Sequence, residues 1–179
     1  MLQIASPKSD HGSRVVEVKF ALEESLRNTL SVYPALEIGN REGGSALYIM
    51  WHLQTEGKNR LFVTCDVNNA PQLLSDFARD WKMDWAHFKM TQERFIKDSM
   101  FTFGFVYLDA DHEYTTVKRD LELLVPKLAK GCIVAVDDVH QWQELPVIEG
   151  LEQVIYEGVD QGMYVNKSHG QHVGFWRRV

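Results

Sequence analysis

Two glycines four residues apart mark the stretch of the chain most suited to ligand binding, between Pro34 and Ser45. A short apolar run precedes Gly39, and apolar residues at helical spacing follow Gly43, which predicts a strand, a glycine-rich turn and a helix. In a parallel α/β sheet such a turn lies at the carboxyl end of its strand, where glycine lets the backbone approach a ligand. Because the amides of the following helix would face the same place, this turn predicts a ligand site.

An acid ends the next predicted strand, which spans residues 60–66 and closes on Asp66. In dinucleotide-binding folds, an acid about 20 residues beyond the glycine turn accepts hydrogen bonds from the ribose hydroxyls. Asp66 lies somewhat further along, which a full helix and turn between the two would explain. The alternative is that Asp66 caps the next helix, because Asn68, Asn69 and Pro71 are typical of a helix start.

The residue pattern of the glycine turn indicates one group of nucleotide-binding folds. Glu37, Gly39 and Gly43 form a Glu-x-Gly-x-x-x-Gly pattern, which departs from the Gly-x-Gly-x-x-Gly of dinucleotide-binding folds. It resembles motif I of the class I S-adenosylmethionine-dependent methyltransferases. Further along, the chain reads Asp109-Ala110-Asp111-His112-x-Tyr114, then Asp120-Leu121, Lys130-Gly131, an apolar run and Asp137-Asp138. This order resembles the branch that also contains the cation-dependent O-methyltransferases, and the resemblance covers about residues 35–139.

The resemblance implies that S-adenosylmethionine is the cofactor. Gly39, Gly43 and neighbouring amides would hold its methionine end, and Asp66 would hold its ribose. Thr91 and Gln92 follow a short predicted strand, where the family has a polar residue near the adenine. The full set of implied cofactor-binding residues is Glu37, Gly39, Asn40, Gly43, Ser45, Asp66, Thr91, Gln92 and Asp109.

The resemblance also implies a metal site. In the cation-dependent members, acids after the fourth and fifth strands bind a divalent metal, and the matching residues here are Asp109, Asp137 and Asp138. A set of carboxylates without thiol or imidazole favours a hard cation such as Mg²⁺, Mn²⁺ or Ca²⁺. The alternative is that these acids cap turns, because several relatives of this fold keep them without any metal.

The proton acceptor departs from the family pattern. Catechol-type relatives have a lysine three residues after the first metal acid, whereas this chain has His112 there. A histidine, with an ordinary pKa of about 6.5, is a suitable base at neutral pH. His112 can equally be a turn residue that is hydrogen-bonded to the backbone. The predicted catalytic residues are therefore His112 and Asp109, with His140 as a further candidate beside the acceptor.

The hydrophobic pattern predicts the elements that position these residues. Helical spacing predicts helices at residues 14–30, after Gly43, at 72–84 and before Gly131. Apolar runs predict strands before Gly39 and at residues 60–66, 86–90, 103–108, 132–136, 154–156 and 171–176. We expect one α/β domain over residues 14–179, with a Rossmann-like, doubly wound sheet of about seven strands, helices on both faces and a C-terminal antiparallel hairpin. Residues 1–13 are expected to form a flexible N-terminal tail.

Composition and charge bear on partners and location. The net charge is -6 and the basic residues are scattered, which disfavours DNA or RNA as the main partner. No run is suited to spanning a membrane and no signal-peptide pattern opens the chain, so we expect a cytoplasmic protein without membrane contact. Cys65 and Cys132 fall on strands that would not be neighbours, which predicts two reduced thiols. The loop around Met163 and Tyr164 would form either a lid or a homodimer contact.

The combined prediction is an enzyme that transfers a methyl group from S-adenosylmethionine to an oxygen of a small-molecule acceptor, with or without a divalent cation. Such a protein mainly has to align donor and nucleophile and help to remove a proton. The alternative is a binding or scaffold protein that keeps the fold without catalysing transfer. A nicotinamide oxidoreductase is disfavoured by the glycine spacing.

Overall fold

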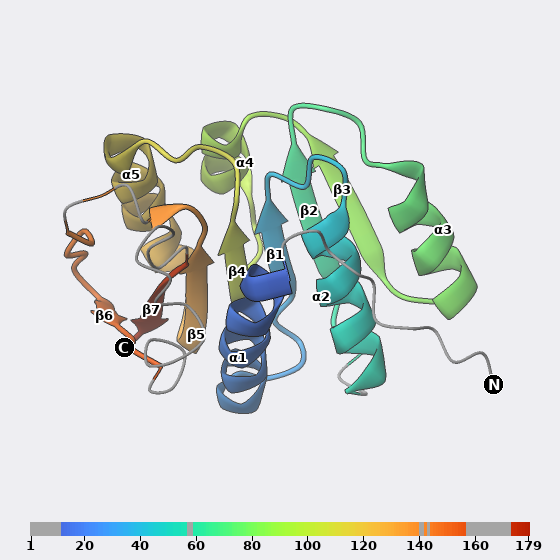
Figure 1. The fold of residues 1–179 in the computed structure, drawn as a ribbon, viewed down its shortest axis with the longest axis horizontal. Helices are drawn as coiled ribbons and strands as arrows, with labels where there is room; N and C mark the ends of the chain where they lie inside the picture. Colours follow the sequence, from blue (N-terminus) through green and yellow to red (C-terminus); the bar gives the residue numbers. More distant parts are fainter. Residues whose placement is uncertain (1–11, 57–58, 140–141, 143, 157–172) are drawn as a thin grey trace.

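The computed structural model describes residues 12–56, 59–139, 142, 144–156 and 173–179 (Figure 1). Their helices are α1 (Gly12–Asn28), α2 (Gly44–Thr55), α3 (Gln72–Trp81), α4 (Gln92–Asp98), α5 (Tyr114–Leu124) and the short 3₁₀ helix η1 (Val125–Lys127). Their strands are β1 (Ala35–Ile38), β2 (Phe62–Asp66), β3 (Trp85–Lys89), β4 (Phe103–Leu108), β5 (Leu128–Val136), β6 (Leu151–Gln153) and β7 (Gly174–Arg178).

One sheet holds these strands in the order β3-β2-β1-β4-β5-β7-β6 (Figure 1). Strands β1 to β5 are parallel, whereas β7 is antiparallel to both β5 and β6. The predicted Rossmann-like sheet with a C-terminal antiparallel hairpin is therefore confirmed, although β6 and β7 begin three residues earlier and three residues later than expected. The strand order reverses between β1 and β4, which is where open parallel sheets bind their ligands.

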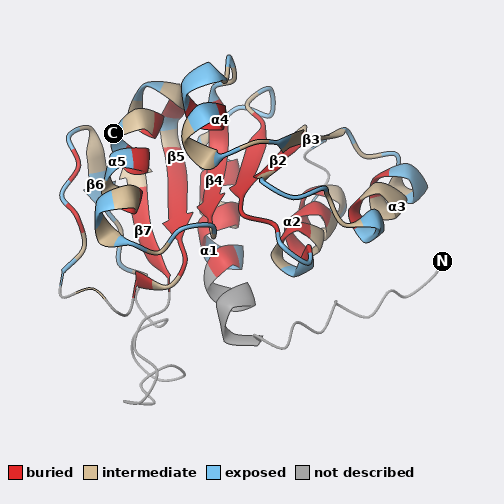
Figure 2. Ribbon diagram, turned by 90° about the horizontal axis from the view of Figure 1, so that it is seen from above, coloured by how far each residue is buried: buried red, intermediate tan, exposed pale blue. Residues whose placement is uncertain are grey.

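Helices cover both faces of the sheet, and each face has its own apolar core (Figure 2). Helices α1, α2 and α3 pack on one face, where β4 contributes Phe105. Helices α4 and α5 pack on the other face, where β4 contributes Val106. Because successive side chains of a strand point to opposite faces, a strand covered on both sides must be apolar throughout, and β4 is buried along its whole length.

Gly131 marks a bulge in β5 and not, as predicted, the end of a helix. Helix α5 ends at Leu124, and β5 already begins at Leu128. Gly131 lies within the strand at a φ of 83°, where the pairing register of β5 with β4 shifts. A Cβ at this position would lie 3.0 Å from the Asn28 side chain. Glycine is therefore required by a local kink in the strand. In the sequence, a glycine at such a kink looks the same as a glycine that ends a helix.

Helices α1 and α3 are shorter than predicted. Helix α1 ends at Asn28, and Leu30 is 65% exposed instead of continuing the apolar stripe. Helix α3 ends at Trp81, three residues before the predicted end at residue 84, and β3 begins at Trp85. At the other end of α1, Gly12 and Ser13 are helical, while the rest of the predicted tail lies outside the described residues.

The two cysteines are free and buried, as predicted. Cys65 lies on β2 and Cys132 on β5, and the strands β1 and β4 separate them in the sheet. Among the helices in the described ranges, none has the length and apolarity needed to cross a membrane.

A buried guanidinium group fixes the end of α1 against the sheet. Arg60 is 1% exposed, and it donates hydrogen bonds to the carbonyl oxygens of Thr29 at 2.7 Å, Tyr33 at 3.0 Å and Leu26 at 3.4 Å. The last carbonyls of a helix have no partner within the helix and carry partial negative charge, so a cation is well placed there. Gly104 on β4 leaves the necessary room, because a Cβ at that position would lie 2.2 Å from the Arg60 Nη1 atom.

We therefore expect Arg60→Met to lower the free energy of unfolding by about 3 kcal/mol, because three carbonyl oxygens in buried or partly buried contacts lose a charged donor. Urea denaturation would measure the change. The matched control is Arg79→Met, because Arg79 is exposed and its carboxylate partners Asp76 and Asp80 are exposed too. That control should change stability by less than about 1 kcal/mol. Equal effects of the two substitutions would contradict the role of Arg60.

Candidate active site

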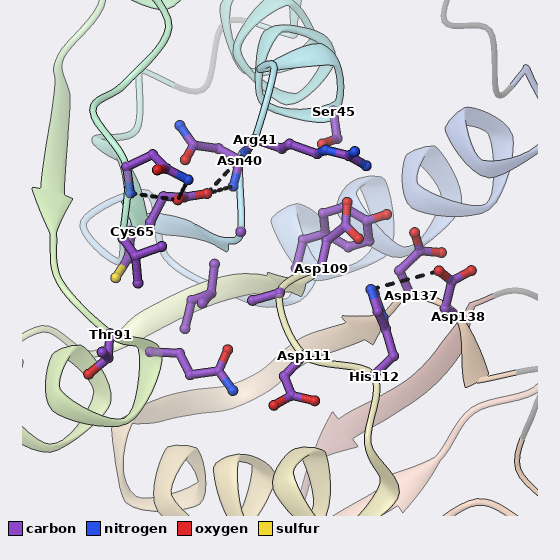
Figure 3. A pocket seen from close by; sticks show the side chains of 18 of the residues that line it. Asn40, Arg41, Ser45, Cys65, Thr91, Asp109, Asp111, His112, Asp137 and Asp138 are labelled. Carbon is purple, nitrogen blue, oxygen red and sulfur yellow. Dashed lines mark hydrogen bonds and ion pairs between the residues drawn. The ribbon is translucent and has the colours of Figure 1, made fainter.

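A pocket of about 970 Å³ opens at the carboxyl ends of β1, β2 and β4, at the point where the strand order reverses (Figure 3). Typical ligand pockets measure about 300–1,000 Å³. The structure brings most of the predicted site residues into its lining: Gly39, Asn40, Gly43, Ser45, Asp66, Thr91, Gln92, Asp109, His112, Asp137 and Asp138. Two predicted residues are not in the lining: Glu37 is buried elsewhere on β1, and His140 lies outside the described residues.

The two glycines of the turn are required by contacts within the protein itself. At Gly39, with a φ of 87°, an added Cβ would lie 2.2 Å from the backbone oxygen of Asp109. The loops that follow β1 and β4 therefore touch at the centre of the sheet edge. At Gly43, with a φ of 85°, an added Cβ would meet the side chains of Leu74 and Pro71 at 3.3 Å. The structure shows that both glycines leave room for neighbouring segments of the chain. That they admit a ligand stays a prediction.

Asp66 ties the glycine turn to the end of β2. Its Oδ2 atom accepts hydrogen bonds from the backbone amides of Asn40 at 3.0 Å and Arg41 at 3.1 Å, and these contacts are drawn as dashed lines beside both residues in Figure 3. Its Oδ1 atom accepts from the amide of Asn68 at 2.8 Å and from the Asn68 side chain at 3.0 Å. The residue that precedes α3 is Pro71, so Asp66 does not cap that helix.

The carboxyl of Asp66 is held ionised by its donors. Partial burial raises the pKa of Asp66, but the hydrogen bonds from Asn68, Arg41 and Asn40 together outweigh burial, so the pKa lies below its ordinary value. An ionised carboxylate in a partly open pocket can accept further hydrogen bonds from a ligand. This is the property that recognition of a ribose diol requires.

Glu37 is a buried acid that contacts a lining residue of the pocket without lining the pocket itself. It is 0% exposed on β1, and its Oε1 atom accepts a hydrogen bond from the hydroxyl of Ser45 in the first turn of α2. Burial raises the pKa of Glu37 to about 8, with a smaller contribution from the charge of Asp66 and an opposing one from the Ser45 hydroxyl. Glu37 therefore carries a proton at neutral pH and supports Ser45, which does line the pocket.

The opposite end of the pocket gathers groups suited to proton transfer. The Nε2 atom of His112 lies 3.8 Å from the Oδ2 atom of Asp138, as the dashed line in Figure 3 marks. Asp138 adopts the left-handed conformation with a φ of 56°, and Asp137 beside it is buried. The backbone oxygen of His112 accepts a hydrogen bond from the indole of Trp142 at 2.9 Å, which anchors the loop that carries the histidine. Asp109, at the end of β4, stands beside this group in the lining.

A family model described as a methyltransferase domain matches residues 36–139, which is more than half of the chain. The chain belongs to this methyltransferase family. The match begins in β1, includes the glycine turn, Asp66 and His112, and ends directly after Asp138. No curated protein matches the sequence of the chain.

Solved structures of methyltransferases share the fold of this methyltransferase domain. A putative methyltransferase, yhhF, from Escherichia coli has a TM-score of 0.63 and 14% identity, over 98% of this chain and 90% of its own. A putative O-methyltransferase from Klebsiella pneumoniae has a TM-score of 0.60 and 10% identity, over 99% of this chain and 83% of its own. An rRNA methylase from Streptococcus thermophilus has a TM-score of 0.62 and 9% identity, over 90% of this chain and 96% of its own. These structures share their fold with this chain, but they do not indicate one kind of methyl acceptor.

Sequence reasoning missed two aromatic residues of the methyltransferase pocket. Tyr48 on α2 and Tyr107 on β4 both line it, and burial raises the pKa of Tyr48 to about 12. Helical spacing would have identified Tyr48, which lies three residues after Ser45 and so on the same face of α2. Alternation along the strand would have identified Tyr107, which lies two residues before Asp109.

The predicted metal site is not supported by the geometry of the methyltransferase domain. Across the described residues, no three His, Cys, Asp or Glu side chains are grouped so that they could hold a metal ion. Asp109, Asp137 and Asp138 share the lining of one pocket, but they do not form such a group. Because each acid follows the end of a strand, the sequence predicted that the three acids would lie in one region. It did not predict how their side chains are oriented relative to one another.

The protonated state of Glu37 should make stability depend on pH. Folding raises the pKa of Glu37 from 4.5 to about 8, so the folded chain binds the proton more tightly than the unfolded chain. Stability contributed by this proton is complete below about pH 4.5 and is lost as pH rises towards about 8, with a slope of up to about 1.4 kcal/mol per pH unit. Urea denaturation between pH 5 and 8 would measure it.

Glu37→Gln should reduce this pH dependence, because an amide carries no proton to lose. The matched control is Glu42→Gln, because Glu42 is an exposed acid in the same turn. That control should keep the slope of the unsubstituted protein. If Glu37→Gln leaves the slope unchanged, Glu37 is not the group responsible.

Proposed function

We propose that this protein is an S-adenosylmethionine-dependent methyltransferase that methylates an oxygen of a small-molecule acceptor. The observation that carries the proposal is the division of one pocket into two chemically different ends. Asp66 and the glycine turn line one end, and His112 and Asp138 line the other. Membership of the methyltransferase-domain family supports methyl transfer as the reaction.

The residues at the first end fit the proposed cofactor. The ionised Asp66 would accept hydrogen bonds from the ribose hydroxyls, and the turn between Gly39 and Gly43 would hold the methionine end. Thr91 and Gln92 line the same pocket from the start of α4, where they would meet the adenine. When bound, S-adenosylmethionine supplies the methyl group, which passes to the acceptor oxygen as its bond to sulfur breaks.

At the second end, His112 would take the proton that the acceptor hydroxyl loses. The Oδ2 atom of Asp138, 3.8 Å from the imidazole Nε2 atom, would stabilise the imidazolium that this proton transfer creates. General-base assistance of this kind contributes about 10²- to 10⁴-fold to a rate. The rest of the acceleration would come from alignment of acceptor and donor in one pocket.

The charge of the lining supports a small acceptor that is not a polyanion. Seven carboxyl groups line the pocket, from Glu42, Asp66, Glu93, Asp109, Asp111, Asp137 and Asp138, against the two guanidinium groups of Arg41 and Arg119. An acidic site of this kind repels phosphate groups, which nucleic-acid enzymes usually attract with basic surfaces. We therefore propose a neutral or cationic hydroxyl compound as the acceptor.

Calorimetric titration should show binding of S-adenosylhomocysteine and no comparable binding of NAD. Asp66→Ala should weaken binding of S-adenosylhomocysteine by about 1.5–3 kcal/mol, because hydrogen bonds to a charged group are lost. The matched control is Asp80→Ala, an exposed acid on α3, which should bind normally. Binding of NAD alone would overturn the proposed cofactor. Normal binding by Asp66→Ala would make Asp66 a purely structural residue.

His112→Gln should lower kcat of methyl transfer by about 100-fold or more without changing the affinity for S-adenosylhomocysteine. Transfer from methyl-labelled S-adenosylmethionine to a panel of small hydroxyl compounds and to rRNA would measure the rate and the acceptor class. A full rate in His112→Gln would exclude this histidine as the base. Cofactor binding without transfer to any acceptor would favour the scaffold alternative.

The predicted cation remains a proposal that chelation can test. If His112 alone accepts the proton, transfer should proceed at an unchanged rate in EDTA. Loss of activity in EDTA and recovery with Mg²⁺ or Mn²⁺ would instead indicate that Asp109, Asp137 and Asp138 gather around a metal during catalysis. Asp138→Ala would then remove the metal requirement together with most of the rate.

A further inference from the structure

A chain of hydrogen bonds crosses from the edge strand β3 to the pocket. The indole Nε1 atom of Trp85 donates to the hydroxyl of Thr64 at 3.2 Å, and that hydroxyl lies 3.0 Å from the Nδ1 atom of His87. The Nε2 atom of His87 lies 3.0 Å from the backbone oxygen of Asn68. Thr64 and His87 are direct cross-strand partners in the β2–β3 pairing, so the sheet register itself holds the chain together.

The donor and the acceptor of each hydrogen bond in this network can be assigned. The backbone oxygen of Asn68 can only accept, so the Nε2 atom of His87 carries a hydrogen and donates to it. In the tautomer with its hydrogen on Nε2, the Nδ1 atom of His87 accepts from the Thr64 hydroxyl, and the Thr64 oxygen accepts from the Trp85 indole, which can only donate. Thr64 is 0% exposed, so this arrangement gives its buried hydroxyl both a donor and an acceptor as partners.

Asn68 connects this chain of hydrogen bonds to the pocket. Its backbone amide and its side-chain amide both donate to the Oδ1 atom of Asp66, at 2.8 Å and 3.0 Å. Asn68 itself is exposed and lies in the turn after β2, where little packing restrains it. The hydrogen bond from His87 to its carbonyl therefore restrains the residue that supplies two of the donors to Asp66.

We propose that His87 is a positioning residue for the ribose-binding carboxylate, acting through Asn68 on the orientation of Asp66. The inference rests on the proposed function, because it assumes that the pocket binds an adenosine-containing cofactor. His87 is not among the residues that line the pocket, so it would act on affinity without touching the ligand. Nothing in the chemistry of methyl transfer passes through it, so its effect should appear in cofactor affinity and not in kcat.

Two amide substitutions separate the two contacts of His87. His87→Gln extends far enough to place a donor near the Asn68 carbonyl, whereas His87→Asn is shorter and retains only the contact with Thr64. Calorimetric titration with S-adenosylhomocysteine should give a Kd that is about five- to tenfold higher for His87→Asn and within about twofold of normal for His87→Gln. At saturating cofactor, kcat should be unchanged in both.

A second readout distinguishes positioning of Asp66 from general loosening of the site. Competition by adenosine and by 2′,3′-dideoxyadenosine gives the preference of the pocket for the ribose hydroxyls. His87→Asn should reduce this preference, because a displaced Asp66 loses contacts that only adenosine can make. A merely structural defect would weaken both nucleosides equally and leave the preference unchanged, which would overturn the inference.

The remaining outcomes are also decisive. Equal affinities of His87→Gln and His87→Asn would overturn the role of the Asn68 contact. If melting shows that His87→Asn does not fold, His87→Phe keeps a ring of similar size but has no donor for the Asn68 carbonyl, and it should raise the Kd and lower the hydroxyl preference in the same way. Failure of the unsubstituted protein to bind S-adenosylhomocysteine would overturn the proposed function, and with it this inference. If the unsubstituted protein binds S-adenosylhomocysteine and the variants bind it equally well, only the inference about His87 is overturned.

Discussion

The carboxylate of Asp66 is the interaction on which the organisation of the pocket depends. It stands at the end of β2, yet two of its four hydrogen bonds come from the amides of Asn40 and Arg41, which belong to the turn after β1. These bonds outweigh the cost of partial burial and keep the pKa of Asp66 below its ordinary value. One ionised group thus fixes the shape of the turn and presents negative charge to a ligand. If the proposed function holds, the structure of the turn and recognition of the ribose depend on the same atoms.

Close contact between the two central loops limits what the sequence can place there. The turn after β1 passes so near to Asp109 that an added Cβ at Gly39 would lie 2.2 Å from its backbone oxygen. This contact occurs where the strand order reverses, so the turns leading to α2 and α5 diverge from a shared point to opposite faces of the sheet. The pocket lies over that point. Its two chemically different ends follow from this divergence, because each loop brings its own polar residues.

The sequence predicts what depends on local pattern, and the structure adds what depends on register and burial. The apolar run of β4 and the acids at strand ends follow local rules, so the sheet could be predicted and most of the predicted site residues do line the pocket. Gly131 was misassigned because a bulge glycine and a helix-ending glycine look alike in one sequence. The protonated state of Glu37 depends on complete burial, which spacing alone does not report. The link from His87 to Asp66 requires the pairing of Thr64 with His87, which only the sheet register provides.

The central claim is that this pocket holds S-adenosylmethionine with its ribose at the carboxylate of Asp66 and its sulfur facing the end that contains His112. A crystal structure of the protein with S-adenosylhomocysteine, soaked with Mg²⁺, tests it most directly. The account predicts both ribose hydroxyls within hydrogen-bonding distance of Asp66, and the homocysteine portion along the turn between Gly39 and Gly43. S-adenosylhomocysteine bound elsewhere, or bound with its ribose away from Asp66, would contradict the account.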